Sequence, residues 1–289
     1  MAEGRTLTVP SCVMTRWHSC CVAMAVSVAA SAPLCRRCRR QALRRQAARC
    51  SWTPDGGDMR AVVQQLAHRA LSLSAPPGQR CLVGVAGCPG GGKTTTVKAV
   101  VQAVNQLAGE EFATSLPMDG FHFSKKQLDA MPDPAAAHAR RGAPFTFDAA
   151  AFVSCVRRAR CTPDGVLRAP SFDHAAGDPM PDGVTLEAQP RHRLVFVEGN
   201  YVFLDTEPWC DLLPLFHDRW FVTTDPEAAT QRIVRRHMAV WGSSLEGATT
   251  RAESNDAPNA RLVWATRQRA APDVWVPVLE DAAFAAGQQ

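Results

Sequence analysis

A glycine-rich octapeptide in the first third of the chain constrains the fold more than any other feature. Residues 87–94 read Gly-Cys-Pro-Gly-Gly-Gly-Lys-Thr and complete the pattern G-x-x-x-x-G-K-S/T. An apolar run at 81–86 precedes the octapeptide, and apolar residues at helical spacing follow it over 95–108. The sequence therefore predicts a strand, a tight loop and a helix in the order that a phosphate-binding loop needs.

Each part of this loop has a use in binding a nucleoside triphosphate. Glycines let backbone N–H groups approach the phosphates, and the following helix N-terminus adds partial positive charge. Lys93 can bridge phosphate oxygens, and the Thr94 hydroxyl can reach Mg²⁺. We therefore expect ATP and Mg²⁺ as cofactors, and we expect these residues to bind the nucleotide: Gly87, Cys88, Pro89, Gly90, Gly91, Gly92, Lys93, Thr94 and Thr95.

The first 51 residues differ in composition from the rest of the chain. They hold nine arginines, no lysine and one acid, Glu3, for a net charge of +8 within a chain whose total is +5. The remainder is mildly acidic at −3, so we expect no nucleic-acid partner. An arginine-rich, acid-poor segment with scattered Ser and Thr is typical of a transit peptide. We expect residues 1–51 to be a disordered leader that directs the protein to a plastid or mitochondrion.

Two other interpretations of this leader stay open. The apolar run 20–32 has the form of a signal-peptide core, but it is shorter than the ~20 residues that span a bilayer, so we expect no stable membrane insertion. A cytosolic extension is the other alternative. Six of the eleven cysteines lie in the leader without disulfide-framework spacing, which favours a reducing compartment. Cys35 and Cys38 form half of a zinc-site pattern with no second half.

The chain after a linker at 51–58 is predicted to be one α/β domain over 58–289. Further strands are predicted at 112–118, 193–197, 219–223 and 273–276, with helical patterns between them. This alternation predicts a mostly parallel sheet with helices on both faces. The polar, proline-rich stretch 162–191 is predicted to be a long connection of the functional or mobile kind.

Two carboxylates follow predicted strands, at the sheet edge where the phosphate loop lies. Asp119 comes directly after the strand at 112–118, and Glu198 directly after the strand at 193–197. Because ligands of parallel sheets bind at the carboxyl ends of strands, both side chains are expected near the γ-phosphate. Asp119 can accept the proton of an attacking hydroxyl, and Glu198 can complete a Mg²⁺ shell with Thr94.

A basic helix is predicted behind the capping sequence that begins at Thr224. Arg232 and Arg236 lie four residues apart and share a face, so both can turn towards phosphate charge when a lid closes. A solvated basic surface is the alternative interpretation. Cys88 inside the loop is interpreted as a tolerated small residue rather than a redox sensor.

Six motifs together resemble those of the uridine kinase, pantothenate kinase and phosphoribulokinase superfamily, nearest its nucleoside-kinase-like and fructose-kinase-like branches. They lie at residues 87–94, 118–122, 140–148, 170–174 and 198–201, and in the arginine helix with Asn255-Asp256-x-x-Asn259 behind it. The resemblance covers roughly residues 58–280. It implies a P-loop NTPase fold with a helical lid, and an ATP-dependent phosphotransferase acting on a hydroxyl of a small metabolite.

The resemblance also implies roles for individual residues. Lys93, Asp119, Arg232 and Arg236 would be catalytic, while Thr94 and Glu198 would hold the metal. Motif positions at which relatives hold the phosphate acceptor fall on His122, Arg141, Asp173, His174 and Tyr201.

The chain departs from uridine kinases at two points. His237 stands where the lid usually has an Asp after Arg, and Tyr201 is the only tyrosine, which indicates an acceptor pocket poor in aromatic side chains. A nucleoside, a sugar or a related acid therefore stays open as the acceptor, and so does a homodimer. Two rival functions are an NTPase switch, although no N-K-x-D motif is present, and a regulatory nucleotide-binding protein.

The leader prediction can be tested directly. Fusing residues 1–51 to a fluorescent reporter should send the reporter to a plastid or mitochondrion, because the Arg-rich, acid-poor composition is that of a transit peptide. Fluorescence microscopy with an organelle marker measures this, and the unfused reporter is the control. A diffuse cytosolic signal from the fusion would contradict the prediction.

Overall fold

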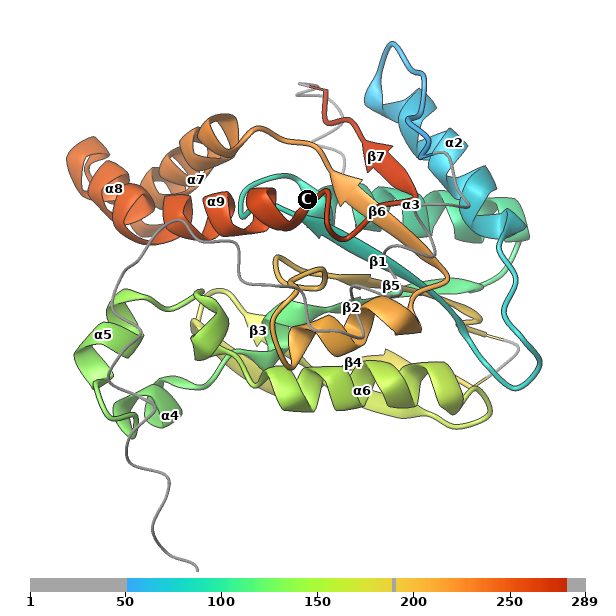
Figure 1. The fold of residues 1–289 in the computed structure, drawn as a ribbon, viewed down its shortest axis with the longest axis horizontal. Coiled ribbons are helices and arrows are strands. Elements are labelled where there is room, and N and C mark those ends of the chain that lie inside the picture. Colours follow the sequence, from blue (N-terminus) through green and yellow to red (C-terminus); the bar gives the residue numbers. More distant parts are fainter. Residues whose placement is uncertain (1–50, 189–190, 280–289) are drawn as a thin grey trace, which may run out of the picture. The chain divides into compact units, whose positions relative to one another are not determined.

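Five parallel strands form the central sheet in the order β2-β5-β1-β6-β7 (Figure 1). The structure is a computed structural model that describes residues 51–188 and 191–279. The strands are β1 (Cys81–Gly87), β2 (Ala113–Pro117), β5 (Leu194–Glu198), β6 (Asp218–Val222) and β7 (Val274–Val276). The predicted strands and the α/β fold class are therefore confirmed. Residues 1–50, with the predicted leader, Cys35 and Cys38, lie outside the described residues.

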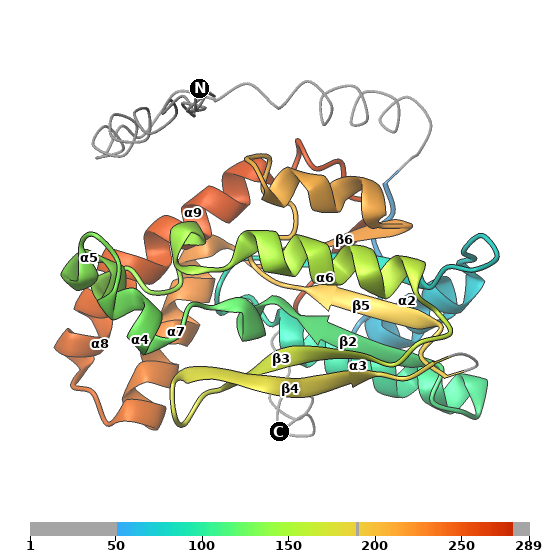
Figure 2. The same ribbon diagram turned by 90° about the horizontal axis from the view of Figure 1, so that it is seen from below.

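Helices cover both faces of this sheet (Figures 1 and 2). β1 is buried along its whole length, and its alternate side chains feed two separate cores. On one face Val83 and Val85 pack with α2 (Met59–Ser72) and α3 (Lys93–Ala108). On the other face Leu82 and Ala86 pack with α6 (Ala149–Cys161) and the short helix η3 (Trp209–Leu215). A strand that is apolar on both sides is what a sheet covered on both faces requires.

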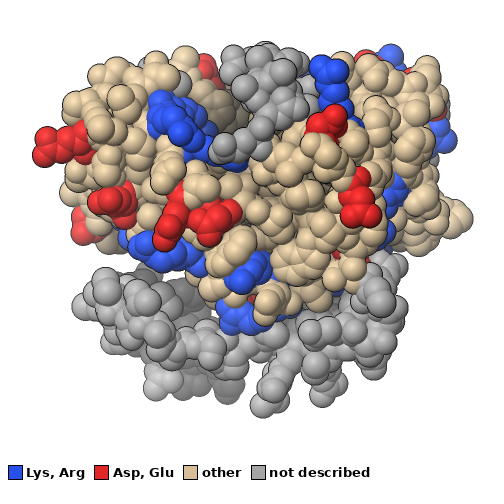
Figure 3. Space-filling model, turned by 90° about the horizontal axis from the view of Figure 1, so that it is seen from above, with Lys and Arg blue, Asp and Glu red and all other residues tan. Residues whose placement is uncertain are grey.

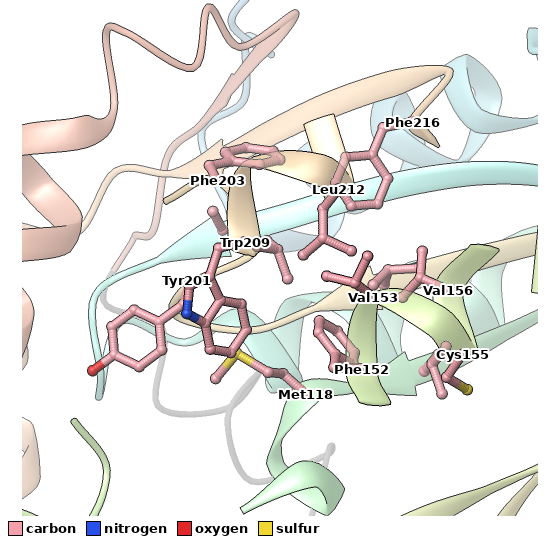
Figure 4. Close-up of a cluster of buried hydrophobic side chains, with 14 of the residues drawn as sticks. Met118, Phe152, Val153, Cys155, Val156, Tyr201, Phe203, Trp209, Leu212 and Phe216 are labelled. Atoms are coloured by element: carbon pink, nitrogen blue, oxygen red, sulfur yellow. The ribbon is translucent and has the colours of Figure 1, made fainter. Parts of the chain in front are cut away.

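The second core contains most of the large aromatic side chains. Figure 4 shows Phe152 of α6 beside Trp209 and Tyr201, which follow β5 in the chain. The Tyr201 ring is fully buried, with its hydroxyl directed out of the cluster. The rings of Tyr201 and Trp209 are tilted against each other with centroids 5.5 Å apart, and those of Phe152 and Trp209 are tilted with centroids 6.1 Å apart. Such contacts add specific geometry to the burial of apolar area.

One prediction about secondary structure is wrong. The stretch 162–191 is not an unstructured connection, because it contains an antiparallel hairpin of β3 (Leu167–Asp173) and β4 (Asp178–Leu186). Only Leu167, Ala169 and Leu186 of this hairpin are fully buried, so the alternation of apolar residues is too sparse to reveal two strands. Its three prolines are tolerated because a two-stranded ribbon has two free edges.

A group of helices stands at the carboxyl ends of the strands. The helical arm, as we call it, consists of α7 (Pro226–Trp241), α8 (Leu245–Arg251), the π-helical turn η4 (Ala252–Asp256) and α9 (Ala257–Thr266). Asp225 caps α7 by accepting from the backbone N–H groups of Glu227 and Ala228, as the capping sequence predicts.

Short elements complete the same end of the molecule. Both views show α4 (Lys125–Asp129) and α5 (Pro134–Ala139) at the end of the sheet where the helical arm lies (Figures 1 and 2). Two further short helices connect them to the sheet and to α6, η1 (Met118–Phe121) and η2 (Pro144–Thr146).

Charged side chains are spread over the surface. Figure 3 shows one face of the molecule, on which basic and acidic groups are interspersed among uncharged ones. The described residues of that face therefore present no continuous basic surface of the kind that tracks a nucleic acid. Within residues 51–188 and 191–279, no helix combines the length and the apolar character needed to cross a bilayer.

A buried arginine at the start of β1 forms hydrogen bonds with the segments before and after the hairpin. The Arg80 side chain is fully buried, and burial lowers its pKa. Its guanidinium donates to six backbone carbonyls, those of Ala159, Thr162, Pro163, Gly165, Glu187 and His192. These carbonyls come from the end of α6, the entry to the hairpin and the exit from it. One side chain therefore joins β1 to three segments that are distant in sequence.

Replacing this arginine should cost stability. Arg80→Met keeps the aliphatic part but leaves buried carbonyls without donors, so we expect the free energy of unfolding to fall by about 3 to 5 kcal/mol. Urea denaturation followed by circular dichroism measures the change. Arg168→Met on the exposed side of β3 is the matched control and should stay within ~0.5 kcal/mol of the parent. Equal stability of the two variants would contradict the structural role of Arg80.

Candidate active site

A cavity of about 540 Å³ opens at the carboxyl ends of the central strands. The phosphate loop and the ends of β2 and β5 line its floor, and the helical arm and the hairpin turn line its sides. Ligands of open parallel sheets bind at this edge. The cavity therefore brings together elements that are far apart in the sequence.

Backbone shape in the phosphate loop explains its glycines. Gly90 and Gly92 have φ angles of +72° and +88°, which side chains with a Cβ rarely adopt. A Cβ on Gly90 would also lie 2.6 Å from the carbonyl oxygen of Ala229 in α7. Glycine thus lets the helical arm pack directly on the loop.

Lys93 is held beneath the loop. Its side chain is 8% exposed, and its Nζ donates to the Cys88 carbonyl at 2.9 Å and to Asn200 Oδ1 at 2.6 Å. Burial lowers the pKa of Lys93, while the carboxylates of Glu198 and Asp119 act in the opposite direction. The lysine is therefore fixed in direction before any phosphate arrives.

Thr94 and Glu198 form the pair predicted to hold the metal. The Thr94 hydroxyl donates to Glu198 Oε1 at 2.8 Å, and both residues line the cavity. Burial raises the pKa of Glu198, as does the neighbouring Asp119, whereas Lys93 lowers it. Magnesium prefers oxygen ligands, one or two of them carboxylates, together with substrate phosphates. The two side chains fit such an ion.

The protein does not offer a complete metal cage by itself. Among the described residues, no group of three or more His, Cys, Asp or Glu side chains gathers around one point. An ion at Thr94 and Glu198 would thus take its remaining ligands from water and phosphate, which is how Mg²⁺ is commonly bound in phosphotransferases.

Asp119 and His122 lie on the turn that follows β2. Asp119 belongs to η1 and lines the cavity with Lys93 and Glu198. The ring of His122 lies with its centroid 3.9 Å from that of Phe147, and its Nδ1 donates to the Asp119 carbonyl at 2.8 Å. Burial lowers the pKa of His122, so the ring is neutral at pH 7. A donating Nδ1 on a neutral ring leaves Nε2 as a hydrogen-bond acceptor.

Arg141 connects this turn to the hairpin. Its guanidinium donates to the Gly177 carbonyl at 2.5 Å, to Asp178 Oδ1 at 2.7 Å and to the Phe123 carbonyl at 3.0 Å. Arg141 and His174 both line the cavity, as their predicted place at the acceptor requires. Phe147 and Phe172 line it too, so the inference of an acceptor pocket poor in aromatic side chains is wrong.

Several predicted site residues do not line the cavity. Asp173 Oδ1 accepts from the backbone N–H groups of Ala175 and Ala176 and so shapes the hairpin turn. The Tyr201 hydroxyl donates to the Gly142 carbonyl at 2.6 Å from within the core. Cys88 is fully buried, and burial raises the pKa of its thiol to about 11, which fits a small packing residue rather than a redox sensor.

The two lid arginines are placed differently. Arg236 lines the cavity, whereas Arg232 does not and has its Nη1 4.0 Å from the position that a Cβ on Gly92 would occupy. His237 is buried, with Nε2 3.9 Å from Asp256 Oδ2. A carboxylate from η4 therefore lies close to the histidine that follows Arg236 on the helix.

A contact between the arm and residues 140–142 was not predicted. Arg140 donates to the side-chain oxygens of Asn255 at 3.2 Å and Asn259 at 3.5 Å, and Asn255 Nδ2 donates to the Arg141 carbonyl at 2.7 Å. Both asparagines are 3% exposed and line the cavity. The spacing of the two asparagines in the sequence indicates a motif. It could not predict their contacts with Arg140 and Arg141, because these residues lie more than 100 positions away.

Other lining residues also escaped the sequence analysis. Asn200 follows Glu198 closely enough to suggest a role, but only the structure reveals its bond to Lys93. Lys125 and Arg251 belong to no motif that would single them out, although both line the cavity. Asp256 also lines it and belongs to the Asn255-Asp256-x-x-Asn259 motif, but the motif assigns it no role.

Comparison with known proteins assigns the chain to a family. No protein-family model matches it. It is 39% identical over 212 residues to "Putative uridine kinase C227.14" of Schizosaccharomyces pombe, covering 73% of this chain and 88% of that protein. It is 46% identical over 124 residues to "ATP-dependent kinase-like protein notR'" of Aspergillus versicolor, covering 42% of this chain and 71% of that protein.

The solved structures agree with these relatives. A "putative fructose transport system kinase" from Silicibacter sp. TM1040 superposes with a TM-score of 0.65 at 28% identity, over 76% of this chain and 99% of that one. The chain therefore belongs to the P-loop kinase family that includes the putative uridine kinase of Schizosaccharomyces pombe.

Proposed function

We propose that this protein transfers the γ-phosphoryl group of ATP to a hydroxyl group of a small metabolite. One observation carries the proposal: Lys93, Thr94, Glu198 and Asp119 line a single cavity at the carboxyl edge of the sheet. These are the groups that phosphoryl transfer needs for charge stabilisation, metal binding and proton acceptance.

The proposed roles follow from the contacts of each side chain. Asp119 accepts the proton of the acceptor hydroxyl and orients it for in-line attack. Lys93, fixed by Asn200, stabilises negative charge on the transferring group. Thr94 and Glu198 hold Mg²⁺, which when bound neutralises charge between the β- and γ-phosphates.

The helical arm is proposed to act as the lid. Arg236 lines the cavity, and Arg232 lies near Gly92, so both guanidinium groups are within reach of phosphates that occupy the loop. Their charge would stabilise the transition state once the arm closes. Location in a plastid or mitochondrion remains a proposal that the composition of residues 1–51 alone supports.

A second function, ATP hydrolysis or nucleotide sensing without an acceptor, is less well supported. The cavity extends beyond the phosphate loop to His122, Arg141 and His174, which a protein that only binds nucleotide would not need. ADP release measured with and without sugars, nucleosides, pantothenate and glycerate separates the two. Release that no acceptor increases would favour the second function.

The catalytic roles predict large losses of turnover. Lys93→Ala should lower kcat by several orders of magnitude, and Asp119→Asn by about 10² to 10⁴ with nearly unchanged ATP affinity. Acceptor-dependent ADP release and ATP titration measure these effects. Lys126→Ala on the exposed side of α4 is the control and should behave like the parent. Turnover of Lys93→Ala within tenfold of the parent would rule out the kinase proposal.

The metal role of Glu198 predicts a change in magnesium dependence. Glu198→Gln removes the carboxylate charge but keeps the hydrogen bond acceptor for Thr94, so the Mg²⁺ concentration at half-maximal rate should rise about tenfold or more. Because burial raises the pKa of Glu198, a proton competes with Mg²⁺, and the parent should need more Mg²⁺ at lower pH. A magnesium dependence identical in both proteins would remove Glu198 from the metal site.

A further inference from the structure

We propose that the phosphate acceptor is a hydroxylated anion, a small molecule with a carboxylate or phosphate group besides the hydroxyl that is phosphorylated. This inference rests on the proposed kinase function and names the substrate class of its acceptor pocket. The pocket is the part of the cavity lined by η1, Lys125, Arg141, the two phenylalanines and residues 174–177 of the hairpin turn.

The charges that line this pocket are mostly basic. Its ionisable lining residues are Asp119, His122, Lys125, Arg141 and His174, and Asp119 is the single acid among the described ones. The remaining cations of the cavity, Lys93, Arg236 and Arg251, belong to the phosphate loop and the helical arm. ATP phosphates account for those cations. They do not account for Lys125 and Arg141, whose side chains contact the hairpin turn, at the carbonyls of Ala176 and Gly177, rather than the phosphate loop.

Two acids lie near these cations, but neither lines the pocket. Asp178 Oδ1 accepts from Arg141 and from the Lys125 backbone N–H at 2.9 Å. Asp173 Oδ1 accepts from two backbone N–H groups of the hairpin turn. Asp178 is thus paired with the Arg141 guanidinium, and Asp173 with the backbone of the hairpin turn, while the side chains of Lys125 and Arg141 both line the cavity.

Both cations keep donors that the protein does not use. Lys125 Nζ donates to the Ala176 carbonyl at 2.7 Å, which engages one of the three protons of an ammonium group. Arg141 Nε is buried and has no hydrogen-bond partner among the described residues. Because Nε of Arg141 is closed off from the cavity, the remaining protons of Lys125 Nζ are the donors open to an anionic ligand in the pocket.

Two groups of the pocket can accept from hydroxyl groups. Asp119 offers carboxylate oxygens, and neutral His122 offers Nε2 as an acceptor because its Nδ1 donates to the Asp119 carbonyl. Acceptors for hydroxyl protons together with donors for an anion describe a hydroxylated acid or a phosphorylated polyol.

The aromatic rings of the pocket do not favour a planar base. The Phe172 ring already contacts the Arg141 guanidinium at 5.6 Å, and the rings of His122 at 4.8 Å and His174 at 5.2 Å. His122 also stacks on Phe147. With these faces in use, the rings support the basic groups instead of forming a free stacking slot.

Matched acceptor pairs test the inference on the full-length protein. Glycerol and glycerate test a carboxylate, fructose and fructose 6-phosphate test a phosphate, and uridine represents a neutral planar ligand. ADP release with MgATP gives kcat/KM for each, and thermal shift with a non-hydrolysable ATP analogue and Mg²⁺ gives binding without turnover. We expect the acidic member of at least one pair to be at least tenfold better in one of these measurements.

The outcomes separate this inference from the kinase proposal. Preferred phosphorylation of a neutral sugar or of uridine would overturn the anionic acceptor and leave the kinase function standing. Binding of an acidic member without phosphoryl transfer would support the pocket and contradict the kinase function. No preference for any acidic member in turnover or binding would overturn the inference.

A lysine pair on α4 sharpens the test. Lys125→Met should raise KM for the preferred acid about tenfold and leave KM for ATP unchanged, because Lys125 lines the acceptor pocket and does not belong to the phosphate loop. Lys126→Met on the same helix, which is exposed and does not line the cavity, should change neither value. Equal KM values for the acid in both variants would overturn the role of Lys125 and with it the inference.

Discussion

The parallel pairing of β1 with β5 is the constraint on which the rest of the site depends. Val85 is in register with Glu198, and the Gly199 N–H donates to the Val85 carbonyl at 3.1 Å. β1 then leads into the phosphate loop while β5 ends in Glu198, so Thr94 meets a carboxylate that lies more than 100 residues away. A shift of one residue in this register would turn Glu198 to the opposite face of the sheet. Backbone hydrogen bonds therefore determine how Thr94 and Glu198 are placed relative to each other.

The two sides of the cavity are built differently. The nucleotide side rests on fully buried strands and on short hydrogen bonds of Lys93 and Thr94. The acceptor side rests on a hairpin with few buried residues, whose turn Arg141 contacts at Gly177 and Asp178. Relatives that share the sheet can therefore differ in acceptor without any change to the phosphate loop.

Local patterns predicted the nucleotide side well and the acceptor side less well. The phosphate loop and the five strands were predictable because each is a contiguous pattern with its own physical reason. The hairpin was missed because only three of its residues are fully buried, and the partners of Arg80 and Arg140 were missed because tertiary contacts alone bring them together. Asp173 and Tyr201 were predicted to contact the acceptor, but both side chains bond to backbone groups instead. A motif position does not reveal whether a side chain faces a ligand or stabilises the backbone beside it.

The contact of Arg140 with Asn255 and Asn259 has a consequence for how such an enzyme diverges. Arg140 donates hydrogen bonds to the helical arm, and the next residue, Arg141, donates to the hairpin. The contacts that hold the arm and the hairpin are therefore made by adjacent residues. The acceptor pocket is therefore not an exchangeable module. A hairpin transplanted from a relative would meet a helical arm that fits a different backbone at 140–142. New acceptor preferences would therefore have to arise by paired changes at 140–142 and 255–259.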